Sequence, residues 1–175
     1  MIQTPRLHLV PFELDHAVAL AGERLELGAL LGVAIPDGWP HFPEAYSVEA
    51  FSTPEDGASA RVWGTYLFLL NDRCSLVGSG GYKGKPVDGV VEVGYEVAPN
   101  FQNRGLATEA TRSMVGHAFS YPQVELVQAH TLGEVNASTK VLNKVGMTFV
   151  EAISDPDHGV VWQWQISRSE SPVPA

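Results

Sequence analysis

The segment from residue 91 to residue 113, VEVGYEVAPNFQNRGLATEATRS, constrains the fold more than any other part of the chain. An apolar-biased strand runs into a tight loop, and the loop opens directly into a helix. This order leaves unpaired backbone N–H groups at the helix N-terminus, where the positive end of the helix dipole also lies. Gly105 lets the backbone turn and approach a ligand closely, and Ala107 is too small to block it. The segment therefore predicts a phosphate-binding loop, and we expect its ligand to be a pyrophosphate.

Two common phosphate-binding motifs do not fit this loop. A P-loop ends in Gly-Lys-Ser or Gly-Lys-Thr, and the sequence contains neither ending. A Rossmann loop carries three glycines and is followed about 20 residues later by an acidic residue. Here the loop holds only Gly105, and the stretch from Tyr121 to Val124 contains no acid. A different phosphate carrier is needed.

The loop resembles the Gln/Arg-x-x-Gly-x-Gly/Ala loop of the GNAT N-acetyltransferases, which hold acetyl-coenzyme A. The similarity extends over most of the chain, and it is greatest to the branch that includes ribosomal-protein N-terminal acetyltransferases. The residues that carry it are Thr4 to Leu9 (TPRLHL), Gly81 to Gly84 (GYKG), Val91 to Tyr95 (VEVGY), Glu109-Ala110, Asn136 to Met147 (NASTKVLNKVGM) and Trp162 to Trp164 (WQW).

This resemblance implies an α/β (α+β) fold of the GNAT type. We expect a mixed, mostly antiparallel central sheet with helices on both faces and one splayed pair of parallel strands. A length of 175 residues suits one buried core. We expect residues 1–168 to form a single GNAT acetyltransferase domain, and residues 169–175 to be a disordered tail.

Hydrophobic periodicity and turn residues indicate where the elements lie. The apolar spacing of Leu14, Val18 and Leu25 predicts a helix over residues 13–27, followed by an irregular excursion over residues 28–52 with a short helix from about residue 47. Further helices are expected at 108–121 and 137–145, and strands at 7–10, 63–70, 74–83, 90–97, 124–131, 147–152 and 160–167. The glycines at 78–81 indicate a bulge or close backbone packing rather than a second phosphate loop.

Composition excludes several classes of partner. The net charge of −9 argues against binding to nucleic acid or to anionic membranes, and it is compatible with cationic amine substrates. The sequence has no apolar run of spanning length and no signal peptide, so we expect a cytoplasmic protein. Cys74 is the only cysteine, and no Cys/His cluster has the spacing of a zinc site. We expect no metal, and we leave open whether the chain forms a homodimer.

The resemblance also implies where acetyl-coenzyme A binds as co-substrate. The pantetheine arm would lie between the strands 91–97 and 124–131 and pair with backbone around Val97. The same backbone would offer an N–H group to the thioester oxygen. The residues expected to bind the coenzyme are Val97, Gln102, Asn103, Arg104, Gly105, Leu106, Ala107, Thr108 and Asn136.

The proton transfers need a base and an acid. Glu92 and Glu96 share one face of their strand, so either could remove a proton from the amine. His130, on the neighbouring strand, is the rival base, because an imidazole suits proton removal at neutral pH. Many relatives protonate the thiolate with a tyrosine at the position where this chain has Leu142. The resemblance implies Ser138 as the acid, because it matches the serine of the N-terminal-acetyltransferase-like branch; capping of the helix is the alternative role, and one serine could do both.

These features predict an N-acetyltransferase in which a primary amine attacks the thioester of acetyl-coenzyme A directly, within a ternary complex. The acceptor is a small-molecule or peptide amine, and the excursion that contains Trp39 and Tyr46 would form part of its pocket. A coenzyme-binding sensor with weak catalysis and a nucleotide-binding module remain the alternatives.

Overall fold

The computed structural model describes residues 1–52, 61–72, 74–156 and 159–171, and its strands form one sheet in the order β1-β2-β3-β4-β5-β6-β8-β7. The strands of this sheet are β1 (Ile2–Gln3), β2 (Leu7–Pro11), β3 (Thr65–Leu70), β4 (Leu76–Tyr82), β5 (Val90–Val97), β6 (Leu126–Leu132), β7 (Thr148–Asp155) and β8 (Gly159–Ser167). The α-helices are α1 (Leu14–Gly22), α2 (Arg24–Leu31), α3 (Val48–Ser52), α5 (Leu106–Phe119) and α6 (Ala137–Val145), and two short 3-10 helices are η1 (Pro43–Tyr46) and η2 (Pro99–Phe101).

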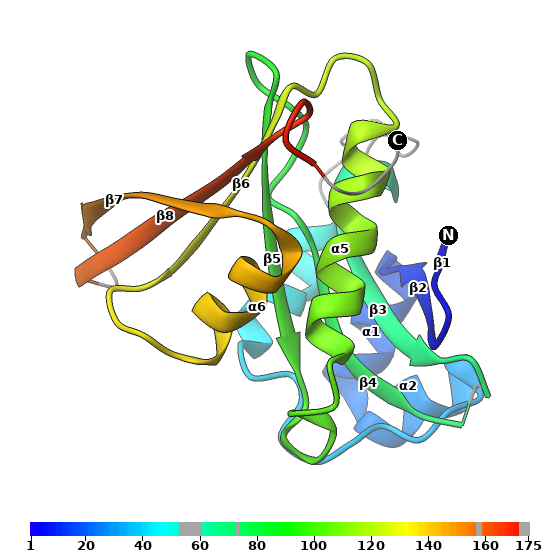
Figure 1. The fold of residues 1–175 in the computed structure, drawn as a ribbon. Coiled ribbons are helices and arrows are strands. Elements are labelled where there is room, and N and C mark those ends of the chain that lie inside the picture. The colour runs from blue at the N-terminus through cyan, green and yellow to red at the C-terminus, as the bar shows by residue number, and fades with distance from the viewer. Residues whose placement is uncertain (53–60, 73, 157–158, 172–175) are drawn as a thin grey trace.

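Helices cover both faces of the sheet, because successive side chains of a strand point to opposite sides. In β3, Phe68 packs into one cluster of buried side chains together with Met114 of α5. Its neighbour Leu67 packs into a second cluster together with Leu27 of α2. Figure 1 shows α5 crossing one face of the sheet while α1 and α2 lie behind it. The predicted fold class is confirmed, including the single parallel pair within a mostly antiparallel sheet.

The parallel pair is short. β5 and β6 are paired only from Val90 to Glu92 and from Leu126 to Gln128. Beyond these residues β5 stays with β4, whereas β6 stays with β8. Figure 1 shows the two strands moving apart on the side where α6 lies. The splay therefore leaves one edge of β5 without a neighbouring strand.

The glycines of β4 are packed against backbone, as the sequence indicates. A Cβ atom added to Gly78 would lie 2.2 Å from the carbonyl oxygen of Glu96, and one added to Gly81 would lie 2.2 Å from that of Gly64. Distances this short exclude any side chain. The whole of β4 is buried, and no helix follows it directly, so this run is not a phosphate loop.

The prediction of one helix over residues 13–27 is wrong. Glu23 adopts an extended conformation that ends α1 and begins α2, and it follows Gly22, a poor helix former. The apolar spacing also indicated the wrong face, because Leu14, Val18 and Leu25 are 41%, 54% and 79% exposed. Other residues of these two helices face the core. Ala17 is the buried residue of α1, and α2 turns Leu27 inward and continues to Leu31.

The remaining elements agree with the sequence to within a few residues. The expected strands at 63–70 and 74–83 begin later, at Thr65 and Leu76, so Cys74 lies in the exposed turn before β4. The expected helix at 108–121 begins earlier, at Leu106, whereas α6 and its closing residue Gly146 lie where predicted. Of the expected tail, residues 169–171 are described after β8, and residues 172–175 lie outside the described part of the chain.

Gly81 and its cross-strand partner Gly94 provide a test of this packing. Gly81→Ala should lower the free energy of unfolding by about 1–3 kcal/mol, because the added methyl group meets the backbone of Gly64. Gly94→Ala is the matched control. Its Cβ would meet nothing within 4 Å, so stability should change by less than about 1 kcal/mol. Urea unfolding at neutral pH measures both variants, and equal losses would contradict the close packing of β4.

Candidate active site

The predicted phosphate loop connects η2 to α5. Asn103 and Gly105 both have left-handed backbone conformations, with φ of 60° and 75°. Gly105 is the N-cap of α5, and no side chain in the described part of the chain makes a capping hydrogen bond to this helix end. The first N–H groups of α5 therefore have no partner within the helix and face outward at the positive end of its dipole. This arrangement can hold an anion through backbone alone.

The edge of β5 that faces the splay carries the backbone groups of alternate residues. The bonds from Ala98 N–H to the Val77 carbonyl and from Lys83 N–H to the Glu92 carbonyl turn the even-numbered residues toward β4. The N–H and C=O groups of Tyr95 and Val97 consequently point into the splay. The Val97 carbonyl accepts a hydrogen bond from Gln102 Nε2 at 3.0 Å, which ties the loop to this edge. The outward N–H groups are available to an extended ligand.

Two cavities meet at the splay, and Ser138 lines both. The smaller, of about 270 Å³, is bounded by the loop, the end of β5 and α6, and brings together Val97, Gln102, Ala107 and Ser138 of the expected site residues. The larger, of about 730 Å³, brings together Glu92, Glu96, His130, Asn136 and Ser138.

The remaining loop residues lie on other sides. A third cavity, of about 520 Å³, is lined by Gly105 and Thr108 on the far side of the α5 N-terminus. Leu106 is buried in the core, so only its backbone can contact a ligand. Asn103 and Arg104 are exposed, and the Arg104 guanidinium lies 5.2 Å from the centre of the Phe101 ring.

Glu92 and His130 form a carboxylate–imidazole pair in the larger cavity. Glu92 Oε1 lies 3.0 Å from His130 Nδ1 and also contacts Lys83 Nζ. Glu92 Oε2 accepts a longer hydrogen bond from Gln128 Nε2, at 3.4 Å. Because Nδ1 faces the carboxylate, the other ring nitrogen of His130, Nε2, remains for the cavity. The geometry is that of an imidazole held and oriented by a carboxylate.

The charge of Glu92 is set by these neighbours. Burial raises the pKa of Glu92. The hydrogen bonds and positive charges of Lys83 and His130 lower this pKa by more than burial raises it, so the net shift is downward. The carboxylate is therefore ionised at neutral pH. A strongly ionised carboxylate is a weak proton acceptor, whereas it stabilises a positive charge on the adjacent imidazole.

Glu96 has different surroundings, although it shares the strand face of Glu92. Its Oε1 accepts a hydrogen bond from the Tyr46 hydroxyl at 2.8 Å, and its Oε2 accepts one from the backbone N–H of His41 at 2.7 Å. The hydroxyl of Ser79 lies 3.2 Å from the same Oε1. Burial and the Glu96 carboxylate raise the pKa of Tyr46 far above its usual value, so the phenol stays protonated and donates. Both oxygens of Glu96 are thus occupied by the segment that covers them.

The excursion contributes less of the cavity wall than the sequence indicates. Trp39 is fully buried and donates its indole N–H to Ser79 Oγ at 2.7 Å, so its side chain cannot reach a substrate. Tyr46 lines the larger cavity, and the half-exposed Phe42 lines it as well. The excursion is held on the sheet by Ser79 and Glu96.

The N-terminus of α6 separates the roles of Asn136 and Ser138. Asn136 is the N-cap, and its Oδ1 accepts a hydrogen bond from the Thr139 N–H at 3.1 Å. The alternative that Ser138 caps this helix is therefore wrong. The carbonyl of Ser138 accepts a hydrogen bond from the Tyr95 hydroxyl at 3.3 Å, and Ser138 lines both cavities. Leu142 is buried in the core.

Sequence reasoning missed Lys83, Gln128 and Ser79 as parts of the site. A signal existed for Lys83, since the turn at residues 86–89 places it across from Glu92 on the adjacent strand, and opposite charges pair in such positions. Ser79 lay within a glycine run that suggested only backbone packing. Gln128 lies on β6, and its contact with Glu92 depends on the parallel pairing.

The described residues include no helix that is long and apolar enough to cross a membrane. Within the same residues, no group of three or more His, Cys, Asp or Glu side chains could hold a metal ion.

The described residues thus combine a splayed parallel pair with the N-terminus of α5 beside it. The family described as the acetyltransferase (GNAT) domain matches residues 6–148. The chain therefore belongs to the GNAT family of acetyl-CoA-dependent acetyltransferases. A comparison with curated protein sequences gives no match.

Solved structures share this fold over nearly the whole chain. A GNAT-family acetyltransferase from Bacillus anthracis has a TM-score of 0.66 at 19% identity, and the match covers 97% of this chain and 99% of that one. RimL, a ribosomal L7/L12 alpha-N-protein acetyltransferase in complex with coenzyme A, has a TM-score of 0.66 at 16% identity, with 94% and 95% covered. Mycobacterium smegmatis RimJ in complex with CoA-disulfide has a TM-score of 0.63 at 20% identity, with 97% and 88% covered.

The lowered pKa of Glu92 predicts how stability depends on pH. A carboxyl group whose pKa is lower in the folded state stabilises the fold fully above its unfolded pKa, and this contribution is lost as the pH falls through the folded value. Glu92→Gln should therefore lower the free energy of unfolding by about 1–3 kcal/mol at pH 7. The difference from the unsubstituted protein should narrow once the pH falls below about 4.

Urea unfolding at a series of pH values from 7 to 3 measures this difference. Glu134→Gln serves as the control, because Glu134 is an exposed glutamate near the same cavity and its substitution should change stability by less than about 0.5 kcal/mol at every pH. A difference for Glu92→Gln that stays constant across the series would show that the carboxylate is not stabilised by its charged neighbours.

Proposed function

We propose that this protein transfers the acetyl group of acetyl-coenzyme A to a primary amine by direct attack within a ternary complex. The observation that carries this proposal is the arrangement at the splay. An uncapped helix N-terminus, an open edge of β5 and the Glu92–His130 pair surround adjoining cavities. We further propose that residues 1–168 form a single domain of this kind, and that the protein acts in the cytoplasm.

The coenzyme would bind along the loop and the edge of β5. Its diphosphate would accept hydrogen bonds from the N–H groups between Asn103 and Thr108. Its pantetheine arm would extend through the smaller cavity beside Val97 and Ala107, where both the open strand edge and a small side chain favour close approach. The solved structures of RimL and RimJ contain coenzyme A or its disulfide, which supports a coenzyme site in this fold. The Asn136 side chain would contact the coenzyme only through groups not used in capping α6.

His130 is the base that this geometry favours, with Glu92 as its orienting partner. The amine arrives as an ammonium ion and loses a proton to His130 Nε2, while Glu92 stabilises the imidazolium that forms. Glu96 is a poor candidate for the base, because its oxygens already accept hydrogen bonds from Tyr46 and His41. Its role would be to hold the excursion over the acceptor side of the cavity.

The freed amine would then attack the carbonyl carbon of the thioester. An N–H group of the β5 edge would stabilise the resulting oxyanion, a contribution typically worth about 10²–10³ in rate. When the carbon–sulfur bond breaks, the Ser138 hydroxyl would donate a proton to the departing thiolate. The attacking nitrogen still carries one proton more than the amide product, and the loss of this proton, directly or through water, would restore the Ser138 hydroxyl. The position of Ser138 supports this role, because Ser138 lines both cavities and Asn136 is the residue that caps α6.

The acceptor would enter the larger cavity, where Phe42, Leu132 and Val161 provide an apolar wall beside Glu92 and His130. RimL is described as an alpha-N-protein acetyltransferase, so the N-terminus of a peptide is one acceptor class to test alongside small amines. The negative net charge of the chain supports a cationic acceptor.

The loop assignment predicts a selective loss of coenzyme binding. Gly105→Val should raise the KM for acetyl-coenzyme A by about tenfold or more, because a β-branched residue disfavours the left-handed conformation and displaces the N–H groups. Gly32→Val is the matched control, since Gly32 ends α2 with φ of 68° and lies outside the site. It should lower stability comparably without changing this KM. Calorimetry with coenzyme A provides the direct check, and absence of binding by the unsubstituted protein would overturn the proposed function.

The base assignment predicts different pH profiles for two variants. Transfer is followed as release of free thiol from acetyl-coenzyme A with a panel of amines and peptide N-termini as acceptors. With the best acceptor, His130→Ala should lower kcat by about 10²–10⁴ and remove the acidic limb of the rate profile. Glu92→Gln should keep that limb and lose less activity. If Glu92→Gln removes the limb and His130→Ala retains it, Glu92 is the base and the assignment is wrong.

A further inference from the structure

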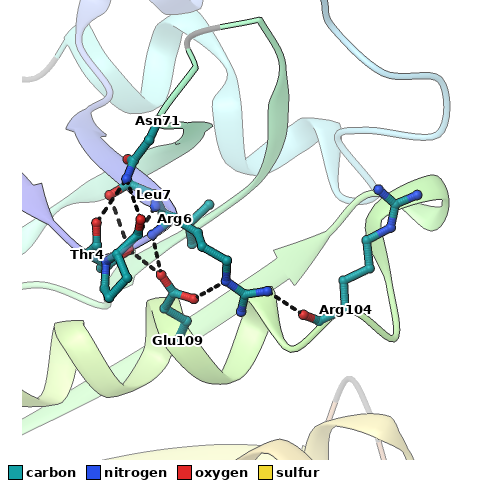
Figure 2. Close-up of polar contacts among 7 residues, drawn as sticks. Thr4, Arg6, Leu7, Asn71, Arg104 and Glu109 are labelled. Carbon is teal, nitrogen blue, oxygen red and sulfur yellow. Dashed lines mark hydrogen bonds and ion pairs between the residues drawn. The ribbon is translucent and has the colours of Figure 1, made fainter.

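Arg6 connects the start of β2 to the phosphate loop, as Figure 2 shows. Its guanidinium donates from Nε to Glu109 Oε2 at 2.6 Å and from Nη1 to the Arg104 carbonyl at 2.8 Å. Its backbone N–H donates to Glu109 Oε1 at 2.8 Å, and the Thr4 hydroxyl donates to the same oxygen at 2.6 Å. Glu109 lies in the first turn of α5. A single carboxylate and a single guanidinium therefore fasten the chain before β2 to the loop that begins α5.

The bond to Arg104 sets the direction of a loop N–H group. In a planar trans peptide the N–H of one residue points opposite to the carbonyl of the residue before it. Because the Arg104 carbonyl is held toward Arg6, the Gly105 N–H points away from Arg6. Gly105, on one side of this peptide, has a left-handed backbone conformation with φ of 75°. Without Arg6, the peptide between Arg104 and Gly105 would lose its anchor and could rotate.

The pair also controls charge beside the loop. Burial raises the pKa of Glu109. The hydrogen bonds from Thr4 and Arg6 and the charge of Arg6 lower this pKa by a larger amount, so the net shift is downward and the carboxylate is ionised. It lies one helical turn from Gly105, where a negative ligand is expected. The Glu109 side chain is 16% exposed, and its closest positive charge among the described residues is Arg6, at 2.6 Å. Arg6 consequently offsets a repulsion that the diphosphate would otherwise meet.

We propose that Arg6 is a positioning residue for the co-substrate. It fixes the loop peptide that presents the Gly105 N–H, and it neutralises Glu109 next to the diphosphate. This inference rests on the proposed function, because it assumes that the loop binds the diphosphate of acetyl-coenzyme A. Arg6 acts through the loop and Glu109, and the reacting atoms lie elsewhere.

Arg6→Ala should weaken binding of coenzyme A by about tenfold, measured by calorimetry, and should raise the KM for acetyl-coenzyme A by a similar factor. The kcat and the KM for the amine should change by less than about twofold. Arg61→Ala is the matched control, because Arg61 Nε makes an ion pair with Glu13 Oε1 at 3.0 Å, outside the site. It should leave all three constants unchanged.

The direction in which a second substitution changes coenzyme A affinity distinguishes positioning from a purely structural role. Glu109→Gln removes the negative charge but keeps an oxygen that can accept from Arg6 and Thr4, so coenzyme A should bind as tightly as before or more tightly. If the network only stabilises the fold, both substitutions should weaken binding and lower the Tm together. Arg6→Lys keeps the charge without the planar fork, and its affinity should be intermediate.

The loss caused by Arg6→Ala should also shrink when the salt concentration rises, relative to the unsubstituted protein, because screening weakens the repulsion from Glu109. An unsubstituted protein that binds coenzyme A, together with an Arg6→Ala variant that folds and binds it equally well, would overturn this inference alone. If Arg6→Ala does not fold, the Arg6→Lys and Glu109→Gln pair decides, and equal affinity of Arg6→Lys to the unsubstituted protein would overturn it. Failure of the unsubstituted protein to bind coenzyme A would instead overturn the proposed function.

Discussion

The early end of the pairing between β5 and β6 is the constraint on which the site depends. Three residues of each strand pair, and then the strands follow different neighbours. The open edge of β5 presents backbone groups that no strand satisfies, and such groups favour an extended ligand over solvent alone. α6 begins beside this opening, and the bond from the Tyr95 hydroxyl to the Ser138 carbonyl holds its first turn against β5. Loop, strand edge and helix end thus converge because two strands separate.

Much of the fold could be predicted because its signals are local. Gly146 closes α6, and the loop before α5 contains the glycine that its geometry requires. The wrong prediction of one helix over residues 13–27 also has a physical cause. The periodicity of large apolar side chains predicts Leu14 and Val18 as buried, whereas α1 buries Ala17 fully and Leu20 only in part. The fit of α1 against its neighbours, which the sequence does not show, therefore decided which of its residues are buried.

The candidate site likewise has one part that the sequence predicts and another part that it does not. The geometry of the loop from Gln102 to Thr108 could be predicted because it depends on backbone conformation, which follows from short sequence patterns. The residues that contact this loop from distant parts of the chain could not be predicted. Arg6 and Arg104 are 98 residues apart in the chain, and only the position of β2 in the sheet brings them together. The pairing of Glu92 with His130 likewise depends on the parallel register between β5 and β6.

Glu92 and Glu96 show how tertiary neighbours assign different roles to equivalent residues. They lie on the same face of one strand, four residues apart, and their sequence surroundings do not distinguish them. Lys83 and His130 approach Glu92 from adjacent strands and make it a charged partner for an imidazole. The excursion approaches Glu96 instead, and its donors occupy both oxygens. The second carboxylate therefore links the segment over the acceptor cavity to the strand that would bind the thioester, so the two halves of the reaction share one rigid element.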